Sequence, residues 1–166
     1  MDKVRCIALD YGGTLDDRTV ARDCDGNYPV DLSCIPPLRE IHGLGVTLVL
    51  STNTEPRQHR RAALDRAGIS GLFRAVLASD CLGLGKPDPG FYAMIPAVAG
   101  CGFEEVLHVG DKLVPDVLGP VNCGMQAALI RPAGGLTPGD FAKLPRGTLL
   151  IDHIRELMRL FAGSGS

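Results

Sequence analysis

Short apolar runs, each bounded by polar or turn-forming residues, recur along the chain. They are too short for helices of ordinary length and have the length of buried strands. The runs occupy residues 4–9, 46–50, 75–77, 106–109 and 126–130. We therefore expect five strands.

Segments of helical character separate these runs. Several have a proline near the start, and Gly68, Gly100 and Gly124 follow the ends of three of them. This placement of proline and glycine is typical of helix termini. The pattern predicts helices over residues 37–44, 57–67, 89–99 and 115–122, and a last amphipathic helix over 152–161.

Strands that alternate with helices at this spacing favour an α/β fold with a parallel sheet covered on both faces. A chain of 166 residues is long enough for one sizeable core but short for two. We place a single domain at residues 1–162 and a flexible glycine–serine tail at 163–166. Because ligands of such sheets bind beyond the carboxyl ends of the strands, the polar residues there are the functional candidates.

The overall charge narrows the classes of partner. The chain has 17 Lys and Arg against 19 Asp and Glu, a net charge of −2, so we expect neither nucleic acid nor a membrane as a partner. The amino terminus lacks the long apolar stretch of a signal peptide, and we expect a cytoplasmic protein. The 6 cysteines are scattered without a CxxC pair, which favours buried free thiols, with a Cys24–Cys34 bridge as the minor alternative.

Carboxylates follow two of the predicted strands. Asp10 ends the first run and precedes Gly12 and Gly13, in a turn whose backbone amides can approach an anion closely. Asp111 follows the fourth run, and Asp116 starts the next helix. A carboxylate at a strand end can act as a nucleophile or as a ligand of Mg²⁺. The structural alternatives are that Asp10 caps its turn and that Asp116 caps its helix.

Lys86 lies among glycines and prolines, where a surface lysine with a purely structural role is the ordinary case. Beside clustered carboxylates and the Thr52 hydroxyl, however, it supplies the fixed positive charge that a transferring phosphoryl group requires. Ser51 is the alternative hydroxyl if the strand ends one residue earlier. Arg57 is weighed as a substrate contact against an ordinary solvated helix face, and His108 is expected to be a packed strand histidine.

Four segments in this order resemble the haloacid dehalogenase (HAD) superfamily: DYGGTL at 10–15, LSTN at 50–53, GKPDP at 85–89 and GDKLVPD at 110–116. The resemblance covers nearly the whole chain and implies a Rossmann-like five-stranded sheet. It implies that Asp10 is the nucleophile and that Lys86 steadies both nucleophile and phosphate. The implied phosphate-binding residues are Thr52, Asn53, Gly13 and Lys86, and the implied Mg²⁺ ligands are Asp10, the Gly12 carbonyl, Asp111 and Asp116.

The sequence departs from the family pattern at Gly12. Phosphatases of the family have an Asp there, which protonates the leaving group and later activates water. Glycine cannot transfer a proton, and general acid–base catalysis typically contributes about 10² to 10⁴ in rate. The resemblance therefore implies a phosphatase that is slow with poor leaving groups.

The chain also lacks the room for a cap domain after its first motif. Residues 20–23 and 27–30 flank Asp25 and Gly26 and predict a small hairpin flap within about residues 16–32, whose acidic side chains we expect to be solvated. An open site suits a large substrate or a protein partner better than dehalogenation, which requires desolvation.

We therefore predict a capless Mg²⁺-dependent hydrolase that acts on a phosphate ester, of a small molecule or a macromolecule, through an aspartyl-phosphate at Asp10. The alternative is a catalytically impaired module that binds an anion or a protein partner. Hydrolysis of a carbon–halogen or carbon–phosphorus bond ranks third. A second copy of the chain or another protein is a candidate to cover the open site.

Overall fold

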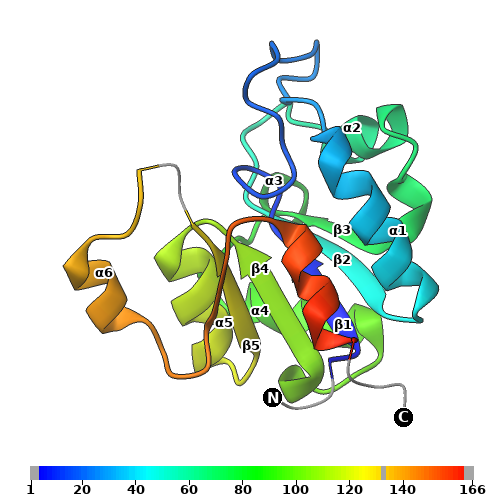
Figure 1. Cartoon of the computed structure of the whole chain (residues 1–166). Coiled ribbons are helices and arrows are strands. Elements are labelled where there is room, and N and C mark those ends of the chain that lie inside the picture. The colour runs from blue at the N-terminus through cyan, green and yellow to red at the C-terminus, as the bar shows by residue number, and fades with distance from the viewer. Residues whose placement is uncertain (1–3, 132–133, 163–166) are drawn as a thin grey trace.

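Six parallel strands form the central sheet of the computed structural model, which describes residues 4–131 and 134–162 (Figure 1). In chain order they are β1 Cys6–Leu9, β2 Thr47–Thr52, β3 Phe73–Ala78, β4 Val106–Gly110, β5 Gln126–Ile130 and β6 Leu149–Ile151. Their order across the sheet is β3-β2-β1-β4-β5-β6. Cys6 of the central strand β1 is in register with Thr47 on one side and Val106 on the other. The predicted parallel sheet is confirmed.

The sheet has one strand more than the five that we predicted. β6 follows a turn at Gly147, where φ is 85°, and pairs with β5 at the edge of the sheet. A three-residue strand next to a predicted helix is too short to stand out in the sequence. The predicted helix over 152–161 is a 3-10 helix, Ile154–Leu160. The predicted tail at 163–166 lies outside the described residues.

The α-helices are α1 Ile35–Gly43, α2 Arg60–Arg66, α3 Ser79–Leu82, α4 Pro89–Ala99, α5 Gly119–Asn122 and α6 Pro138–Lys143. Short 3-10 turns occupy Leu32–Cys34, Ser70–Leu72 and Phe103–Glu105, and a π-helical segment, Leu113–Leu118, leads into α5. A proline stands in the first turn of α1, α4 and α5, as the sequence predicts. Within the described ranges, no helix combines the length and the apolar character that a membrane span requires.

Of the predicted helices, α4 keeps the bounds 89–99, whereas α1 begins at Ile35, two residues before the predicted start. α2 begins at Arg60 because Arg57 has a φ of 78°, a left-handed conformation that interrupts a helix. The helix predicted over 115–122 begins earlier and is π-helical over its first part. α6 was not predicted, since its six residues lie in a segment with no strong apolar period.

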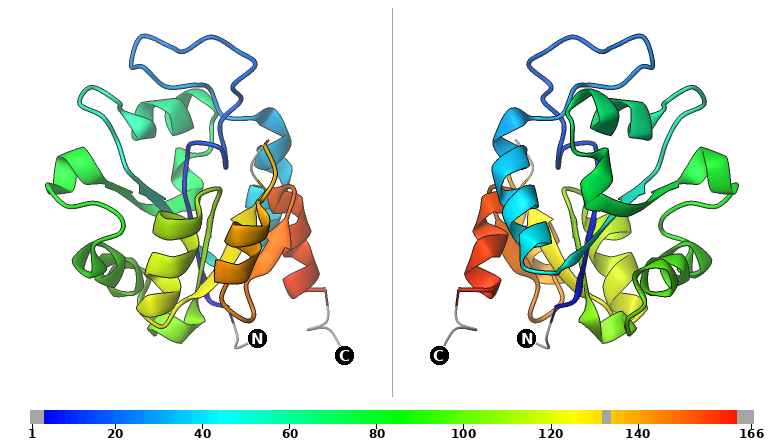
Figure 2. Two further views of the ribbon diagram at one scale, coloured as in Figure 1. Left: turned by 90° about the vertical axis from the view of Figure 1, so that its left-hand side faces the viewer. Right: turned by 90° about the vertical axis from the view of Figure 1, so that its right-hand side faces the viewer.

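The core lies on both faces of the sheet, because alternate residues of each strand point to opposite sides. Ile7 and Leu9 of β1 belong to a buried cluster with α1, α2 and the 3-10 helix Ile154–Leu160. Cys6 and Ala8 belong to a second buried cluster with α4. Figure 2 shows these helical layers on the two sides of the sheet. Helices on both faces are thus confirmed.

The predicted flap, which we define as residues 16–31, is an irregular loop beyond the carboxyl end of the sheet (Figure 1). Its two limbs run antiparallel: Asp17 N–H donates to the Pro29 carbonyl at 2.8 Å, and Asp23 N–H donates to the Asn27 carbonyl at 2.8 Å. This antiparallel course agrees with the predicted hairpin flap, but its limbs form no strands beyond an isolated bridge between Asp16 and Val30. The Asp17 and Asp23 side chains accept hydrogen bonds from nearby backbone amides, which competes with strand pairing.

Candidate active site

Polar side chains meet at the carboxyl ends of β1, β2 and β4. Asp10 directly follows β1, Thr52 is the last residue of β2, and Asp111 directly follows β4. Asp10 and Thr52 are buried, with 6% and 1% of their surfaces exposed. The three strands are neighbours in the order β2-β1-β4, so the parallel topology brings these residues to one edge, as predicted.

Lys86 joins this group from the loop before α4. Its Nζ lies 3.1 Å from Oδ1 of Asp10 and 2.6 Å from Oδ1 of Asp116, and all three side chains are buried. The amide of Asn53 holds the loop in place, because its Oδ1 accepts from Lys86 N–H at 2.8 Å and its Nδ2 donates to the Lys86 carbonyl at 2.8 Å. The Asn53 side chain is therefore engaged with the Lys86 backbone. Asn53 also lines a cavity together with Asp10 and Thr52, and its part in phosphate binding stays a prediction.

The glycine before the lysine is required by this packing. A β-carbon on Gly85 would lie 2.7 Å from Oδ1 of Asn53 and 2.8 Å from Cβ of Ser79. A side chain at this position would push the loop away from Asn53. The Asn53 side chain and the Gly85–Lys86 segment thus fix the lysine beside the carboxylates.

Asp116 and Asp111 complete a cluster of three carboxylates. Asp116, in the π-helical segment, is fully buried, and its Oδ2 accepts from Lys112 N–H at 3.0 Å. Oδ1 of Asp111 is buried and has no hydrogen-bond partner within the described ranges. Burial, together with the charges of Asp10 and Asp116, raises the pKa of Asp111 to about 6. These are the properties of a site that is short of positive charge.

The residues present fit a divalent cation. One carboxylate oxygen from each of Asp10, Asp111 and Asp116 lies within 4.8 Å of the others. Lys86 pairs with Asp10 and Asp116 but not with Asp111, and the three carboxylates leave an excess of negative charge that Mg²⁺ would neutralise. Hard oxygen ligands are those that Mg²⁺ prefers. Gly12, whose carbonyl the family resemblance implies as a further ligand, lines a cavity together with Asp10 and Asp116.

The two candidate hydroxyls at the end of β2 have different surroundings. The Thr52 side chain lines the cavity, and its hydroxyl lies 3.3 Å from the Asn53 carbonyl, to which it donates. Oγ of Ser51 instead lies 3.0 Å from Nε2 of His108, whose Nδ1 lies 3.1 Å from the Asp116 carbonyl. His108 is fully buried, as predicted. The geometry therefore selects Thr52 over Ser51.

The turn after β1 needs glycine for two reasons. Gly13 has a φ of 74°, and a β-carbon there would overlap the carboxylate of Asp111. Its N–H donates to Oδ1 of Asp16 at 2.6 Å. This amide is therefore already paired with a carboxylate, although we expected it to bind phosphate. Asp16 was not among the predicted site residues, because a polar residue in an irregular loop gives no periodic signal.

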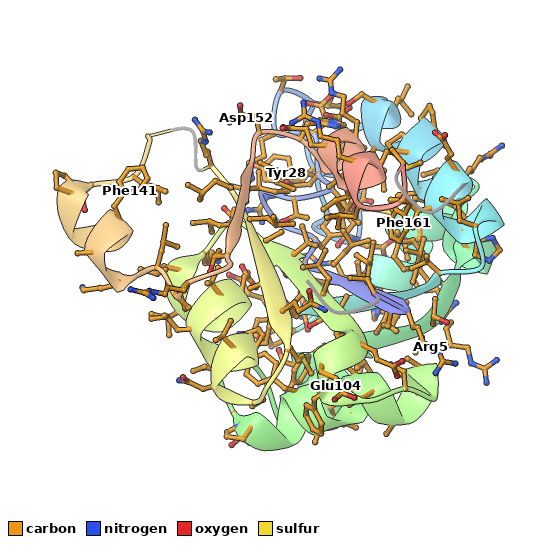
Figure 3. All side chains as sticks on the ribbon, turned by 60° about the horizontal axis from the view of Figure 1, so that its bottom comes forward. Arg5, Tyr28, Glu104, Phe141, Asp152 and Phe161 are labelled. Carbon is orange, nitrogen blue, oxygen red and sulfur yellow. The ribbon has the colours of Figure 1, made fainter. Side chains whose placement is uncertain are left out.

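A cavity of about 440 Å³ opens from this group toward the flap. Its lining includes the flap residues Gly26 and Tyr28 and three arginines that the sequence did not single out, Arg18, Arg22 and Arg60. In Figure 3, Tyr28 marks this end of the molecule, while Arg5 and Glu104 lie toward the opposite end. Arg57, which we weighed as a substrate contact against a solvated surface position, is exposed and is not part of the cavity lining.

Arg60, and not Arg57, is the arginine of this segment that lines the cavity. Its guanidinium carbon lies 4.5 Å from the centre of the Tyr11 ring, and its Nη1 donates to Oδ1 of Asn27 at 2.8 Å. Asn27 is fully buried, and its Nδ2 donates to the His59 carbonyl at 3.2 Å. These contacts attach the flap to the start of α2.

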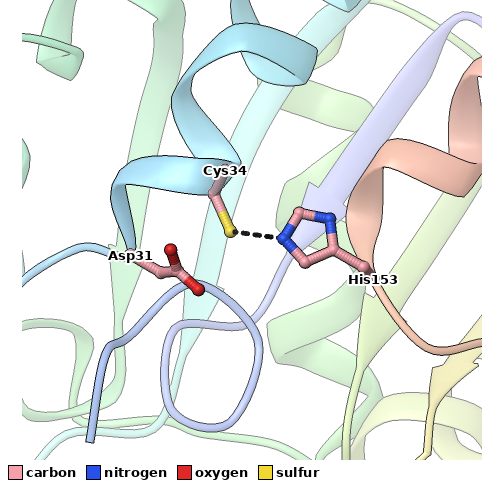
Figure 4. Close-up of side chains that lie close together, drawn as sticks. All are labelled: Asp31, Cys34 and His153. Atoms are coloured by element: carbon pink, nitrogen blue, oxygen red, sulfur yellow. Dashed lines mark hydrogen bonds between the residues drawn. The ribbon is translucent and has the colours of Figure 1, made fainter. Parts of the chain in front are cut away.

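A second group of potential metal ligands, Asp31, Cys34 and His153, lies between α1 and the C-terminal 3-10 helix (Figure 4). Sγ of Cys34 lies 3.8 Å from Nε2 of His153, and Nδ1 of His153 accepts from Arg155 N–H at 3.1 Å. The neutral imidazole therefore has its proton on Nε2, which opposes metal binding through that atom. Burial raises the pKa of Cys34 to about 12. We interpret this group as a hydrogen-bonded link between two elements.

All 6 cysteines are free. Cys6 and Cys34 are buried, as expected, but Cys24 and Cys81 are exposed. The minor alternative of a Cys24–Cys34 bridge is therefore wrong.

Comparison with known proteins agrees with the geometry. A family model described as haloacid dehalogenase-like hydrolase matches residues 17–124, more than half of the chain. The chain belongs to this family. Within the HAD family, the Thermus thermophilus phosphoserine phosphatase is 34% identical over 130 residues, which are 78% of this chain and 50% of that protein.

Two further relatives extend the comparison. A phosphoglycolate phosphatase of Cereibacter sphaeroides is 38% identical over 125 residues, 74% of this chain and 54% of that protein. The crystal structure of a HAD phosphatase from Thermococcus onnurineus matches with a TM-score of 0.69 at 25% identity, over 81% of this chain and 59% of that chain. The chain spans about half the length of the curated HAD relatives that it matches.

Proposed function

We propose that this HAD-family chain is a Mg²⁺-dependent phosphatase that acts on a phosphate ester through an aspartyl-phosphate at Asp10. The observation that carries the proposal is the buried Asp10 carboxylate, which lies at a strand end, 3.1 Å from Lys86, and lines a cavity together with Thr52. Such a carboxylate is positioned for nucleophilic attack on phosphorus. The phosphatase names of the relatives add support.

Each residue has a defined part in the proposed reaction. Asp10 attacks phosphorus, and its carboxylate becomes an acyl phosphate. Lys86 and the Thr52 hydroxyl bind the nonbridging oxygens, where negative charge must be balanced. Asp10, Asp111, Asp116 and the Gly12 carbonyl would hold Mg²⁺, which supplies further charge neutralisation at the phosphoryl group. Water then releases inorganic phosphate and restores the carboxylate.

The glycine at position 12 determines which step of the proposed reaction we expect to be slow. Without a proton donor at this position, alkyl esters should react slowly, while an aryl phosphate should still phosphorylate Asp10, because its leaving group departs without a proton. Hydrolysis of the acyl phosphate should then limit turnover. We expect p-nitrophenyl phosphate with Mg²⁺ to give a burst of p-nitrophenolate approaching one equivalent, followed by a slower steady state.

The control is Asp10→Asn, which keeps the size of the side chain and removes the nucleophile. The burst should vanish in this variant, while its unfolding temperature should stay near that of the wild type. Equal product release by both proteins, with Mg²⁺ binding shown by calorimetry, would contradict the proposal.

That contrary result would favour a second candidate, a HAD-fold module that binds an anion or a protein partner. The replacement of the proton-transferring Asp by Gly12 and the open cavity are the observations that favour it. Cleavage of a carbon–halogen or carbon–phosphorus bond ranks third, because the cavity lining is largely polar and charged. A cytoplasmic location, a macromolecular substrate, and a second copy or another protein over the cavity stay predictions.

A further inference from the structure

An arginine occupies the space that a side chain at position 12 would fill. A β-carbon placed on Gly12 would lie 3.3 Å from Nη2 of Arg18 and 4.0 Å from Oδ2 of Asp16. Gly12, Asp16 and Arg18 all line the cavity that contains Asp10. The guanidinium therefore lies beside the position that the side chain of the missing proton donor would occupy.

Asp16 holds this arginine in place. Nε of Arg18 lies 3.2 Å from Oδ2 of Asp16, whose side chain is only 3% exposed. Oδ1 of Asp16 accepts from Gly13 N–H at 2.6 Å, and an isolated bridge to Val30 fixes the Asp16 backbone. The buried carboxylate thus binds one edge of the guanidinium, while Nη2 makes no hydrogen bond to the described residues.

A guanidinium cannot replace a general acid, because it keeps its proton at neutral pH. It can, however, donate hydrogen bonds to an oxygen that becomes negative as its bond to phosphorus breaks. Its planar fork also matches the geometry of carboxylate and phosphate. These properties suit a leaving group that departs as a stable anion and needs no proton.

We propose that Arg18, held by Asp16, binds the leaving group, and that the site takes phosphoryl donors whose leaving group departs as an anion, namely acyl phosphates and phosphoanhydrides. This inference rests on the proposed phosphatase chemistry at Asp10, and it moves the preferred substrate from phosphate esters to these two classes of phosphoryl anhydride. In the first step an oxygen of Asp10 bonds to phosphorus. The bond from phosphorus to the leaving oxygen breaks, and its electron pair stays on that oxygen, which departs as a carboxylate or phosphate anion.

The second step uses water. Its oxygen bonds to phosphorus, the bond to the Asp10 oxygen breaks, and the electron pair returns to the carboxylate. Both protons of the water leave with inorganic phosphate, which exchanges them with solvent. No other reactant is needed.

The test compares kcat/KM with Mg²⁺ for acetyl phosphate, pyrophosphate and ethyl phosphate. Arg18→Gln should lower the values for acetyl phosphate and pyrophosphate by about 10² to 10³, the usual effect of removing one such donor. The value for ethyl phosphate should fall much less, because its slow step is limited by the absent proton. For each substrate, the kcat/KM of the variant is divided by that of the wild type. The higher intrinsic reactivity of acetyl phosphate cancels in this ratio.

Two variants serve as controls. Arg159→Gln removes another exposed, ion-paired arginine, far from the cavity in the C-terminal 3-10 helix, and should change none of the three values. Gly12→Asp restores a carboxyl group, and its β-carbon meets only the flexible end of Arg18 as a close contact. It should raise the value for ethyl phosphate by about 10² to 10⁴.

Arg18 is 56% exposed at its side chain, so Arg18→Gln should fold, which thermal unfolding will check. If it does not fold, Arg18→Lys keeps the charge without the fork and should give a partial loss.

An equal effect of Arg18→Gln on all three substrates, or no gain for ethyl phosphate in Gly12→Asp, would overturn the inference. If p-nitrophenyl phosphate turnover depends on Asp10 while Arg18→Gln has no effect, this inference fails and the proposed function stands. If no phosphate compound reacts through Asp10, both fail.

Discussion

The chemistry of the site depends on three clustered carboxylates, of which Asp10 and Asp116 are ion-paired with Lys86. Asp111 is the carboxylate that lacks a direct partner within the described ranges, and burial beside Asp10 and Asp116 raises its pKa to about 6. Removing its charge should therefore relieve repulsion in the metal-free protein. We predict that Asp111→Asn unfolds in EDTA at a temperature equal to or higher than the wild type.

The same variant should lose its response to metal. A ligand that binds the folded state stabilises it by about 2.7 kcal/mol at a concentration 100 times its Kd. We expect 10 mM Mg²⁺ to raise the unfolding temperature of the wild type and to have little effect on Asp111→Asn. Asp152→Asn is the matched control, since its carboxylate is 70% exposed, and it should respond like the wild type. A full Mg²⁺ response in Asp111→Asn would remove this residue from the metal site.

His108, which is buried beside the site, makes the free energy of unfolding depend on pH. Burial, and then the charge of Lys86, lower the pKa of His108 from 6.5 to about 3. Between these values the unfolded chain binds a proton that the folded chain does not. The stabilisation is therefore complete above about pH 7 and declines as the pH falls from about 6.5 toward 3. At pH 5.5 the loss from this residue should be on the order of 1 kcal/mol.

Urea unfolding at pH 7.5 and pH 5.5 tests this prediction. His108→Gln should be less stable than the wild type at pH 7.5, because Ser51 and the Asp116 carbonyl lose their partner. Its stability should nevertheless change less between the two pH values. An identical pH dependence in both proteins would show that His108 does not contribute it.

Sequence reasoning placed Asp10, Thr52, Lys86, Asp111 and Asp116 together, and the structure brings them to one edge of the sheet. Such reasoning works for residues at strand ends, because parallel topology fixes where strand ends meet. It failed for Asp16, Arg18 and Arg60, whose side chains reach the cavity from irregular loops or a helix start. Their positions depend on side-chain hydrogen bonds that leave no period in the sequence.

At the scale of elements, the flap depends on a few contacts to α2. Asn27 is fully buried and bonds the His59 carbonyl and Arg60, whereas Arg66 forms exposed ion pairs with Asp23, at 2.8 Å, and with Asp25. Buried polar groups left without a partner cost about 1–3 kcal/mol, while exposed ion pairs contribute about 0–1 kcal/mol. The buried amide should therefore dominate.

We predict that Asn27→Ala increases amide hydrogen exchange throughout residues 16–31 and lowers the free energy of unfolding by about 1–3 kcal/mol. Arg66→Gln, its matched control on the exposed side of the same contact, should change exchange only slightly. Equal effects of the two substitutions would show that charge, and not the buried amide, fixes the flap.

The predicted elements differ in how well their patterns define them. The five longer strands and α4 have apolar runs or proline and glycine signals that match their bounds closely. β6 has only three residues, and α6 has a proline in its first turn but exposes most of its surface and therefore lacks an apolar pattern. The π-helical segment carries Asp116, whose side chain bonds Lys86 and the Lys112 amide, and these are tertiary and local contacts that leave no period in the sequence.

At the scale of the whole molecule, the C-terminal segment completes the first face of the core. Ile154 and Leu157 are 0% and 1% exposed, and they belong to the same cluster as Leu38 and Ile41 of α1. Most of the chain lies between α1 and this segment. A substitution that weakens the contact between them therefore tests whether the described residues unfold as one unit. The sequence predicted an amphipathic helix here but gave no partner for its apolar face.

Ile154→Ala should lower the free energy of unfolding by about 2–5 kcal/mol, since it removes a fully buried side chain and leaves a cavity. The dependence of the free energy on urea should keep its slope, because the whole domain still unfolds in one transition. Leu32→Ala, at a leucine that is 74% exposed, should change stability by less than about 0.5 kcal/mol. If Ile154→Ala left the main transition in place and added an earlier one, the C-terminal segment would unfold separately. The link between Cys34 and His153 would then open first, before the sheet that carries Asp10, and the metal response would survive that first transition.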